Sequence, residues 1–125
     1  MPSPHFSKVV VFFMVQIIGT KKCPETRKAL RTCKERSWEC QFVDLSQREL
    51  SDGEWNNLFS AFSAEDLIDT ASAYYQKEGY AWRDFDPKEE LKAHWQLLKT
   101  PVLRSKGKCA LGCDLDFLRQ YGAKS

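Results

Sequence analysis

The spacing of hydrophobic residues changes along the chain. Residues 9–18 form an apolar run rich in Val, Ile and Phe and interrupted only by Gln16, and Gly19-Thr20 follows it as a turn signal. Such a run is typical of a buried β-strand. Residues 24–36 instead predict a helix, since small or apolar side chains recur at i, i+3, i+4 and i+7, namely Thr26, Ala29, Leu30 and Cys33. A second short strand is predicted at residues 41–45.

Helical spacing returns between residues 51 and 98, where three further helices are predicted. Each helix has its own start signal. In chain order these signals are Ser51-Asp52, Ser63 with Asp66, and Asp86-Pro87. The apolar stripes behind these signals are Trp55, Leu58, Phe59 and Phe62; Leu67, Ile68, Ala71 and Tyr75; and Leu91, Trp95 and Leu98. A hairpin is predicted over residues 102–111, and a last helix from about 114 to 121. The predicted order is therefore β-α-β, three helices, then β-β-α.

These elements predict one α/β domain. The 125 residues suffice for a single core, and the chain has no internal repeat, low-complexity tract or interior linker. Residues 1–13 are interpreted as an N-terminal extension that need not be native, because Met14 is a second potential start, and residues 122–125 as a tail. The domain itself covers residues 14–121. The helices at about 51–98 are interpreted as an insertion packed on the same sheet.

Charge and cysteine content exclude several classes of protein. The 19 Lys and Arg residues nearly balance the 17 Asp and Glu residues, whereas a protein that binds nucleic acid through phosphates is normally more basic. The apolar run near the N-terminus is too short to cross a bilayer and lacks a signal-peptide cleavage pattern. Five irregularly spaced cysteines do not suit a secreted disulfide scaffold. We therefore expect a cytoplasmic protein that binds neither nucleic acid nor membrane.

Cys23 is the strongest candidate for chemistry. Pro24 suits the first position of a helix, which places Cys23 at the N-cap, where free backbone N–H groups and the helix dipole favour a thiolate. Lys22 and Arg27 add positive charge nearby, and Thr26 lies one turn further on, where its hydroxyl could reach the sulfur. These features predict a nucleophile near neutral pH. The alternative is that Cys23 is only a small residue beside a turn.

Three segments resemble the arsenate reductase/Spx-like (ArsC-like) branch of the thioredoxin fold. Residues 17–30 resemble its first strand, active-site turn and helix, in which a Cys-x-x-Ser/Thr/Cys-Arg segment is usual. Residues 98–103 resemble the segment that leads to its cis-proline, and residues 109–114 resemble its last strand and the start of its last helix. The resemblance covers about residues 14–121. It implies a thioredoxin-like fold, in which a small mixed sheet is flanked by helices, with Cys23 as the redox-active thiol.

The sequence departs from this family where arsenate is bound. Arsenate reductases of this class use arginines, one of them directly before the cis-proline, and Thr100 stands there instead. Neither residues 67–72 nor residues 109–112 supply another arginine. A tetrahedral dianion would lose its bidentate partners, which scattered cations do not replace. Arg83, Arg104 and Lys99 could compensate only through an arrangement that the sequence does not reveal.

The same segments also resemble the elements with which glutaredoxins hold glutathione. The matching residues are Cys23, Pro24 and Thr26; Thr100 and Pro101; and Gly112, Cys113 and Asp114. Amides at a helix start can receive the γ-glutamyl carboxylate, and the backbone before a cis-proline can pair with the peptide. The resemblance thus implies a cis Thr100-Pro101 bond and glutathione as co-substrate, with no bound cofactor. Taken singly, Asp114 is an ordinary N-cap and Pro101 a strand-edge proline.

The remaining cysteines have plainer interpretations. Cys33 lies on the apolar stripe of the first helix, about 15 Å of helical rise from Cys23, which indicates a core residue. Cys40 is expected to pack beside the second strand. Cys113 is the candidate resolving thiol, because the resemblance places it near the site. Cys109, Cys113 and His94 do not have the spacing of a zinc site, so no metal is expected.

Two functions from different classes follow. The first is a glutathione-linked thiol reductase, in which the Cys23 thiolate attacks an oxidised substrate sulfur. The second is a non-catalytic module similar to the Spx regulators, which bind a protein partner. Those regulators typically carry a Cys-x-x-Cys switch, and Thr26 removes it here. The sequence favours the reductase over both this module and a true arsenate reductase.

Overall fold

The computed structural model describes residues 15–123, which fall into two compact units. One unit comprises the chain up to Arg48 and from Thr100 onward, and the other is Glu49–Lys99. The second unit spans nearly the same residues as the predicted insertion at about 51–98, and its interpretation as an insertion packed on the sheet stays a prediction. The predicted extension at residues 1–13 and the alternative start at Met14 lie outside the described residues.

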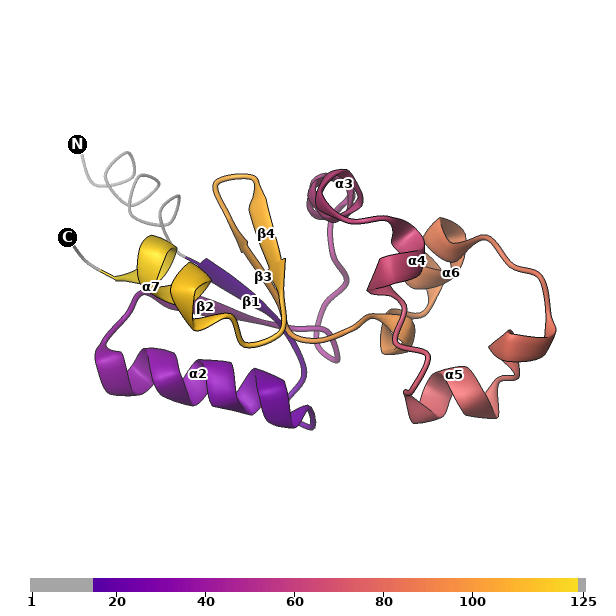
Figure 1. The fold of residues 1–125 in the computed structure, drawn as a ribbon, viewed down its shortest axis with the longest axis horizontal. Helices are drawn as coiled ribbons and strands as arrows, with labels where there is room; N and C mark the ends of the chain where they lie inside the picture. The colour runs from indigo at the N-terminus through magenta and orange to yellow at the C-terminus, as the bar shows by residue number, and fades with distance from the viewer. Residues whose placement is uncertain (1–14, 124–125) are drawn as a thin grey trace. The chain divides into compact units, whose positions relative to one another are not determined.

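The first unit is a four-stranded mixed sheet with two helices (Figure 1). Its elements are β1 (Val15–Gly19), α2 (Pro24–Arg36), β2 (Cys40–Asp44), β3 (Val102–Ser105), β4 (Lys108–Leu111) and α7 (Leu115–Gly122). The strand order is β2-β1-β3-β4. β1 is parallel to β2 and antiparallel to β3, which is antiparallel to β4. The predicted β-α-β and β-β-α halves are confirmed and share this sheet.

Both helices of this unit cover the same face of the sheet. α2 and α7 contact each other, and both contact β1. The core between them consists of Val15, Ile17, Ala29, Cys33, Leu103, Phe117 and Leu118. Because side chains alternate along a strand, Ile18 points to the opposite face, where it is also fully buried. Burial on both faces fits the apolar residues of β1, and residues 9–14 of the apolar run lie outside the described residues.

The second unit is helical. Its elements are α3 (Asp52–Ala61), α4 (Ala64–Leu67), α5 (Ala73–Lys77), the 3₁₀ turn η1 (Tyr80–Trp82), α6 (Pro87–Ala93) and the 3₁₀ turn η2 (Trp95–Leu97). The predicted start signals are confirmed, since Ser51 forms a capping box with Glu54 and the side chains of Ser63 and Asp86 cap α4 and α6.

Two predicted helices of this unit are interrupted. The stripe that ends at Leu98 is divided, since α6 ends at Ala93 and Trp95–Leu97 forms a separate 3₁₀ turn. The stripe from Leu67 to Tyr75 suggested a continuous helix, but α4 ends after Leu67 and α5 begins only at Ala73. Ile68 forms a β-bridge with Leu98 instead. The Asp69 carboxylate accepts a hydrogen bond from the Ala71 N–H at 3.0 Å, a local bond that competes with helix formation.

A disulfide joins Cys33 in α2 to Cys40 in β2. Cys33 is buried in the core as predicted, but the pairing was not predicted. The chain reverses at Ser37, whose φ of 58° is left-handed, and this brings the two Cα atoms to 6.5 Å, within the range of disulfides. Disulfides are commoner in oxidising compartments than in the cytoplasm, so the cytoplasmic location stays a prediction. No helix among residues 15–123 has the length and hydropathy needed to span a bilayer.

Candidate active site

Cys23 lies between the end of β1 and the start of α2. β1 ends at Gly19, and a tight turn follows in which the Cys23 N–H donates to the Thr20 carbonyl at 3.2 Å. Pro24 then opens α2, which has 13 residues. Cys23 has extended backbone angles at the N-cap and its side chain caps no backbone N–H, so the sulfur is available for chemistry.

Thr26 packs beneath the sulfur in the first turn of α2. Its side chain is fully buried, and its hydroxyl oxygen makes no hydrogen bond to any described residue. Gly19 makes this position possible, because a Cβ there would lie only 3.0 Å from Thr26 Cγ2 and closer still to its hydroxyl. A buried hydroxyl without a partner is rare in folded proteins and points to a role at a site.

The segment before β3 closes the other side of Cys23. The Thr100-Pro101 peptide bond is cis, as the resemblance implied. The Cys23 thiol donates to the Thr100 carbonyl oxygen at 3.5 Å. The Pro101 carbonyl accepts the Gly112 N–H at 2.8 Å, which fastens the turn after β4 to the same segment. The structure therefore brings together three segments that are far apart in the sequence.

This environment lowers the pKa of the Cys23 thiol below its ordinary value. Burial acts in the opposite direction and raises it, but the hydroxyls of Thr100 and Thr26 and the N–H groups of Thr26 and Glu25, which can donate to the thiolate form, together outweigh burial. On ionisation these donors replace the bond from the thiol to the Thr100 carbonyl. The arrangement therefore favours a thiolate, the nucleophilic form of cysteine.

The predicted basic residues are placed differently. Lys22 is exposed in the turn before Cys23, and Arg27 directs its Nη1 at the Lys21 carbonyl, 3.3 Å away. Hydroxyls and amides, rather than either cation, are the groups that lower the pKa of Cys23. A contribution of Lys22 and Arg27 to thiolate stabilisation stays a prediction.

The turn Gly112-Cys113-Asp114 precedes α7. Gly112 has a φ of 78°, which favours glycine, and the Asp114 side chain caps α7 by accepting the Phe117 N–H at 3.0 Å. Asp114 is thus an N-cap, the ordinary structural role expected for it when it is taken singly. The Cys113 N–H donates to Glu25 Oε2 at 3.3 Å, so a carboxylate of this chain already occupies that amide.

Glu25 is the site residue that sequence analysis missed. Acidic residues are common in the first turn of a helix, so its position carried no distinctive signal. The turn it contacts comes 88 residues later in the chain. Only the folded structure shows that the Glu25 carboxylate accepts from the Cys113 N–H. That N–H belongs to the helix start that the resemblance to glutaredoxins suggested for a glutathione carboxylate.

The other free thiols differ from Cys23. Cys109 and Cys113 are unpaired, and burial raises the pKa of both thiols. Lys28 and Arg31 partly oppose this shift at Cys113, while Glu25 and Asp114 add to it. Cys113 therefore lacks the groups that favour a thiolate at Cys23, and its predicted role as resolving thiol stays a prediction.

The arginines that could replace the missing arsenate ligands are engaged elsewhere. Arg104, on β3, donates to Gln16 Oε1 at 2.5 Å, and Arg83 belongs to the helical unit, where its guanidinium lies over the Tyr80 ring. Over residues 15–123, the structure gathers no group of three or more metal-ligating side chains.

Solved structures resemble this arrangement over most of the chain. The YffB protein matches with a TM-score of 0.74 and 19% identity, over 88% of this chain and all of the other. An arsenate reductase (ArsC) related protein from Brucella melitensis matches with a TM-score of 0.65 and 22% identity, over 86% of this chain and 93% of the other. The fold is that of the arsenate reductase-related proteins.

An arsenate reductase from Vibrio cholerae has this fold too, with a TM-score of 0.68 and 14% identity over 86% of this chain and 97% of that one. No family model and no curated protein matches the sequence. At these identities the likeness establishes the ArsC-like, thioredoxin-type fold, and the chemistry must be argued from the site itself.

Proposed function

We propose that the protein is a thiol-disulfide oxidoreductase that uses Cys23 as its single nucleophile and glutathione as co-substrate. The observation that carries this proposal is the set of donors around the Cys23 sulfur, above all the buried Thr26 hydroxyl that has no other partner. Such donors stabilise a thiolate both as attacking group and as leaving group.

The reaction has two exchange steps. The Cys23 thiolate attacks the glutathione sulfur of a mixed disulfide, so that a Cys23-glutathione disulfide forms and the substrate leaves as a thiolate that takes up a proton. The thiolate of a second glutathione then attacks the glutathione sulfur of this intermediate. Glutathione disulfide leaves, and the Cys23 thiolate is regenerated. Thr26 takes the place of a second cysteine, which favours this monothiol route.

Charge supports an anionic co-substrate. Residues 15–48 and 100–123, the described part of the unit that contains Cys23, have 12 Lys and Arg residues against 6 Asp and Glu residues. Glutathione has two carboxylates and one ammonium group at neutral pH, so it is attracted to such a surface. Its γ-glutamyl carboxylate would bind the Cys113 N–H after displacing Glu25, and Lys22 or Arg27 would meet the other carboxylate.

A second candidate is a non-catalytic protein-binding module. One observation favours it, since Trp82 is 91% exposed and a large exposed aromatic side chain is common at protein interfaces. Arsenate reduction has no comparable support, because Arg104 is bonded to Gln16 and Arg83 lies over the Tyr80 ring.

The test is reduction of the mixed disulfide between glutathione and 2-mercaptoethanol by excess glutathione, compared for the wild type, Cys23→Ser and Cys113→Ser. We expect activity in the wild type and in Cys113→Ser, and none in Cys23→Ser. Activity that persists in Cys23→Ser, or a wild type no faster than glutathione alone, would refute the proposal and favour the binding module.

A further inference from the structure

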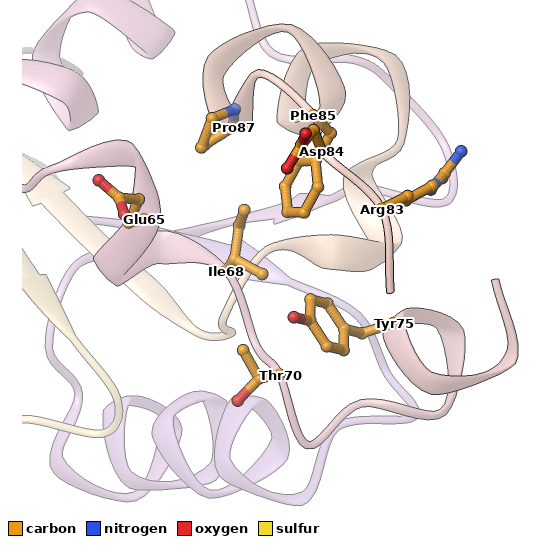
Figure 2. A pocket seen from close by; sticks show the side chains of 8 residues that line it. All are labelled: Glu65, Ile68, Thr70, Tyr75, Arg83, Asp84, Phe85 and Pro87. Atoms are coloured by element: carbon orange, nitrogen blue, oxygen red, sulfur yellow. The ribbon is translucent and has the colours of Figure 1, made fainter. Parts of the chain in front are cut away.

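The helical unit contains a cavity of about 300 Å³ that the proposed function does not use. Its lining consists of Glu65, Ile68, Thr70, Tyr75, Arg83, Asp84, Phe85 and Pro87. Figure 2 shows the side chains of Ile68, Tyr75 and Phe85 directed toward one another around this space. Polar and apolar groups contribute about equally to its lining, and its volume lies at the lower end of the range of small-molecule sites.

Tyr80 holds the aromatic walls in place. It is 2% exposed, and its hydroxyl donates to Glu90 Oε1 at 2.8 Å. Tyr75 stacks on its ring with centroids 5.7 Å apart, and Phe85 meets the same ring edge-on at 4.9 Å. Burial and the neighbouring Glu90 raise the pKa of Tyr80 to about 12, so this anchor stays protonated at physiological pH. The walls are therefore formed before any ligand arrives.

Within the part of the chain that the structure describes, two exposed carboxylates and one hydroxyl of the lining have no partner of their own. Among the described residues, the carboxylates of Glu65 and Asp84 and the hydroxyl of Tyr75 make no hydrogen bond or ion pair. Arg83, the one cation of the lining, lies over the Tyr80 ring at 4.0 Å and 4.0 Å from Glu90. Figure 2 shows it pointing away from the cavity.

The helical unit as a whole has a negative net charge, the same sign as the carboxylates that line the cavity. Residues 49–99 contain 11 Asp and Glu residues against 5 Lys and Arg residues, the reverse of the unit that contains Cys23. A surplus of this kind attracts cations to the surface, and aromatic walls bind them further through the faces of their rings.

We propose that this cavity binds a small organic cation, namely a protonated amine on an aromatic or branched aliphatic body. The apolar body contacts Ile68, Tyr75 and Phe85, and the ammonium group donates to the Asp84 carboxylate and the Tyr75 hydroxyl. All the residues that line the cavity belong to the helical unit, and the proposal does not depend on the proposed reductase activity.

The probe is 2-phenylethylammonium, titrated into the full-length protein and followed by the backbone amide resonances in two-dimensional NMR. The neutral 2-phenylethanol and the anionic phenylacetate are matched ligands of similar shape. We expect saturable shifts confined to residues near 65–75 and 83–87, with the ammonium compound binding tightest of the three.

Two variants separate the cavity from the general charge of the unit. Asp84→Asn removes an exposed carboxylate that lines the cavity, and Asp66→Asn removes another exposed carboxylate, which does not line it. We expect Asp84→Asn to raise the dissociation constant about fivefold, in keeping with a partly exposed ion pair, and Asp66→Asn to change it less than twofold. Shifts that do not saturate up to 10 mM probe, equal binding of phenylacetate, or equal effects of the two variants in well-dispersed spectra would each overturn the proposal.

Discussion

Replacing Thr26 by Val separates the chemistry of this residue from its packing. Val keeps the shape and the buried methyl group but removes the hydroxyl that faces the Cys23 sulfur. A hydrogen bond to a charged group contributes about 1.5–3 kcal/mol, and a sulfur acceptor that is partly exposed lowers this to about 1 kcal/mol. The thiolate population below the pKa of Cys23 should therefore fall roughly fivefold.

Thr26→Val should not lower the stability of the protein, although it lowers the thiolate population. The Thr26 hydroxyl oxygen is buried without a hydrogen bond, so its loss removes an unsatisfied polar group, which normally destabilises a fold by about 1–3 kcal/mol. We expect the midpoint of urea unfolding to stay the same or rise. Loss of a structural hydrogen bond would have the opposite effect.

The assay is the rate of iodoacetamide alkylation at Cys23 between pH 5 and 10, read by peptide mass spectrometry. Thr32→Val is the matched control, because it makes the same substitution further along α2. The reasoning is refuted if Thr26→Val alkylates like the wild type, or if it loses more than about 1 kcal/mol of unfolding free energy, since the hydroxyl would then have a structural partner.

Three further predictions concern the surroundings of the site. Gly19→Ala should lower the free energy of unfolding by about 1–3 kcal/mol, because the added Cβ meets the Thr26 side chain. Adding Thr26→Ala to the same chain should restore most of this loss. If urea unfolding showed that the effects of the two substitutions are additive, this contact would be contradicted. Glu25→Gln should lower the KM for glutathione about two- to threefold with little change in kcat, since the competing carboxylate is lost; a raised KM in steady-state kinetics would show that Glu25 helps binding instead. Replacing both Cys33 and Cys40 by Ser should cost about 2.5 kcal/mol, the chain-entropy value for a loop of this length; an unchanged melting curve for the variant and for the protein treated with dithiothreitol would contradict the disulfide.

Features determined by nearby residues could be predicted from the sequence. The N-caps Ser51, Ser63, Asp86 and Asp114 all bond to N–H groups two or three residues ahead, so their signals are contained in a few letters. The position of Cys23 before Pro24 is equally local. The order of strands and helices followed from these signals and from the change in hydrophobic spacing.

Features that depend on residues distant in the sequence could not be predicted in this way. The predicted helix beyond Leu67 fails because Ile68 pairs with Leu98, and helical spacing does not report such a bridge. The disulfide depends on the reversal at Ser37, and the role of Glu25 depends on a turn 88 residues away. Within the site, the sequence indicated Thr26 but did not reveal that its hydroxyl lacks any other partner.

The central claim is that the fold makes Cys23 the reactive thiolate of this chain. The most direct measurement is the pH dependence of its alkylation beside Cys109 and Cys113 in the same sample, with Cys23→Ser as the blank. Because donors lower the pKa of Cys23 whereas burial raises that of the other two thiols, its curve should rise at lower pH than theirs. Glutathione disulfide should also modify Cys23 first. A Cys23 curve that coincides with those of Cys109 and Cys113, or that rises above the pH of a free thiol, at about 8.5, would contradict the account.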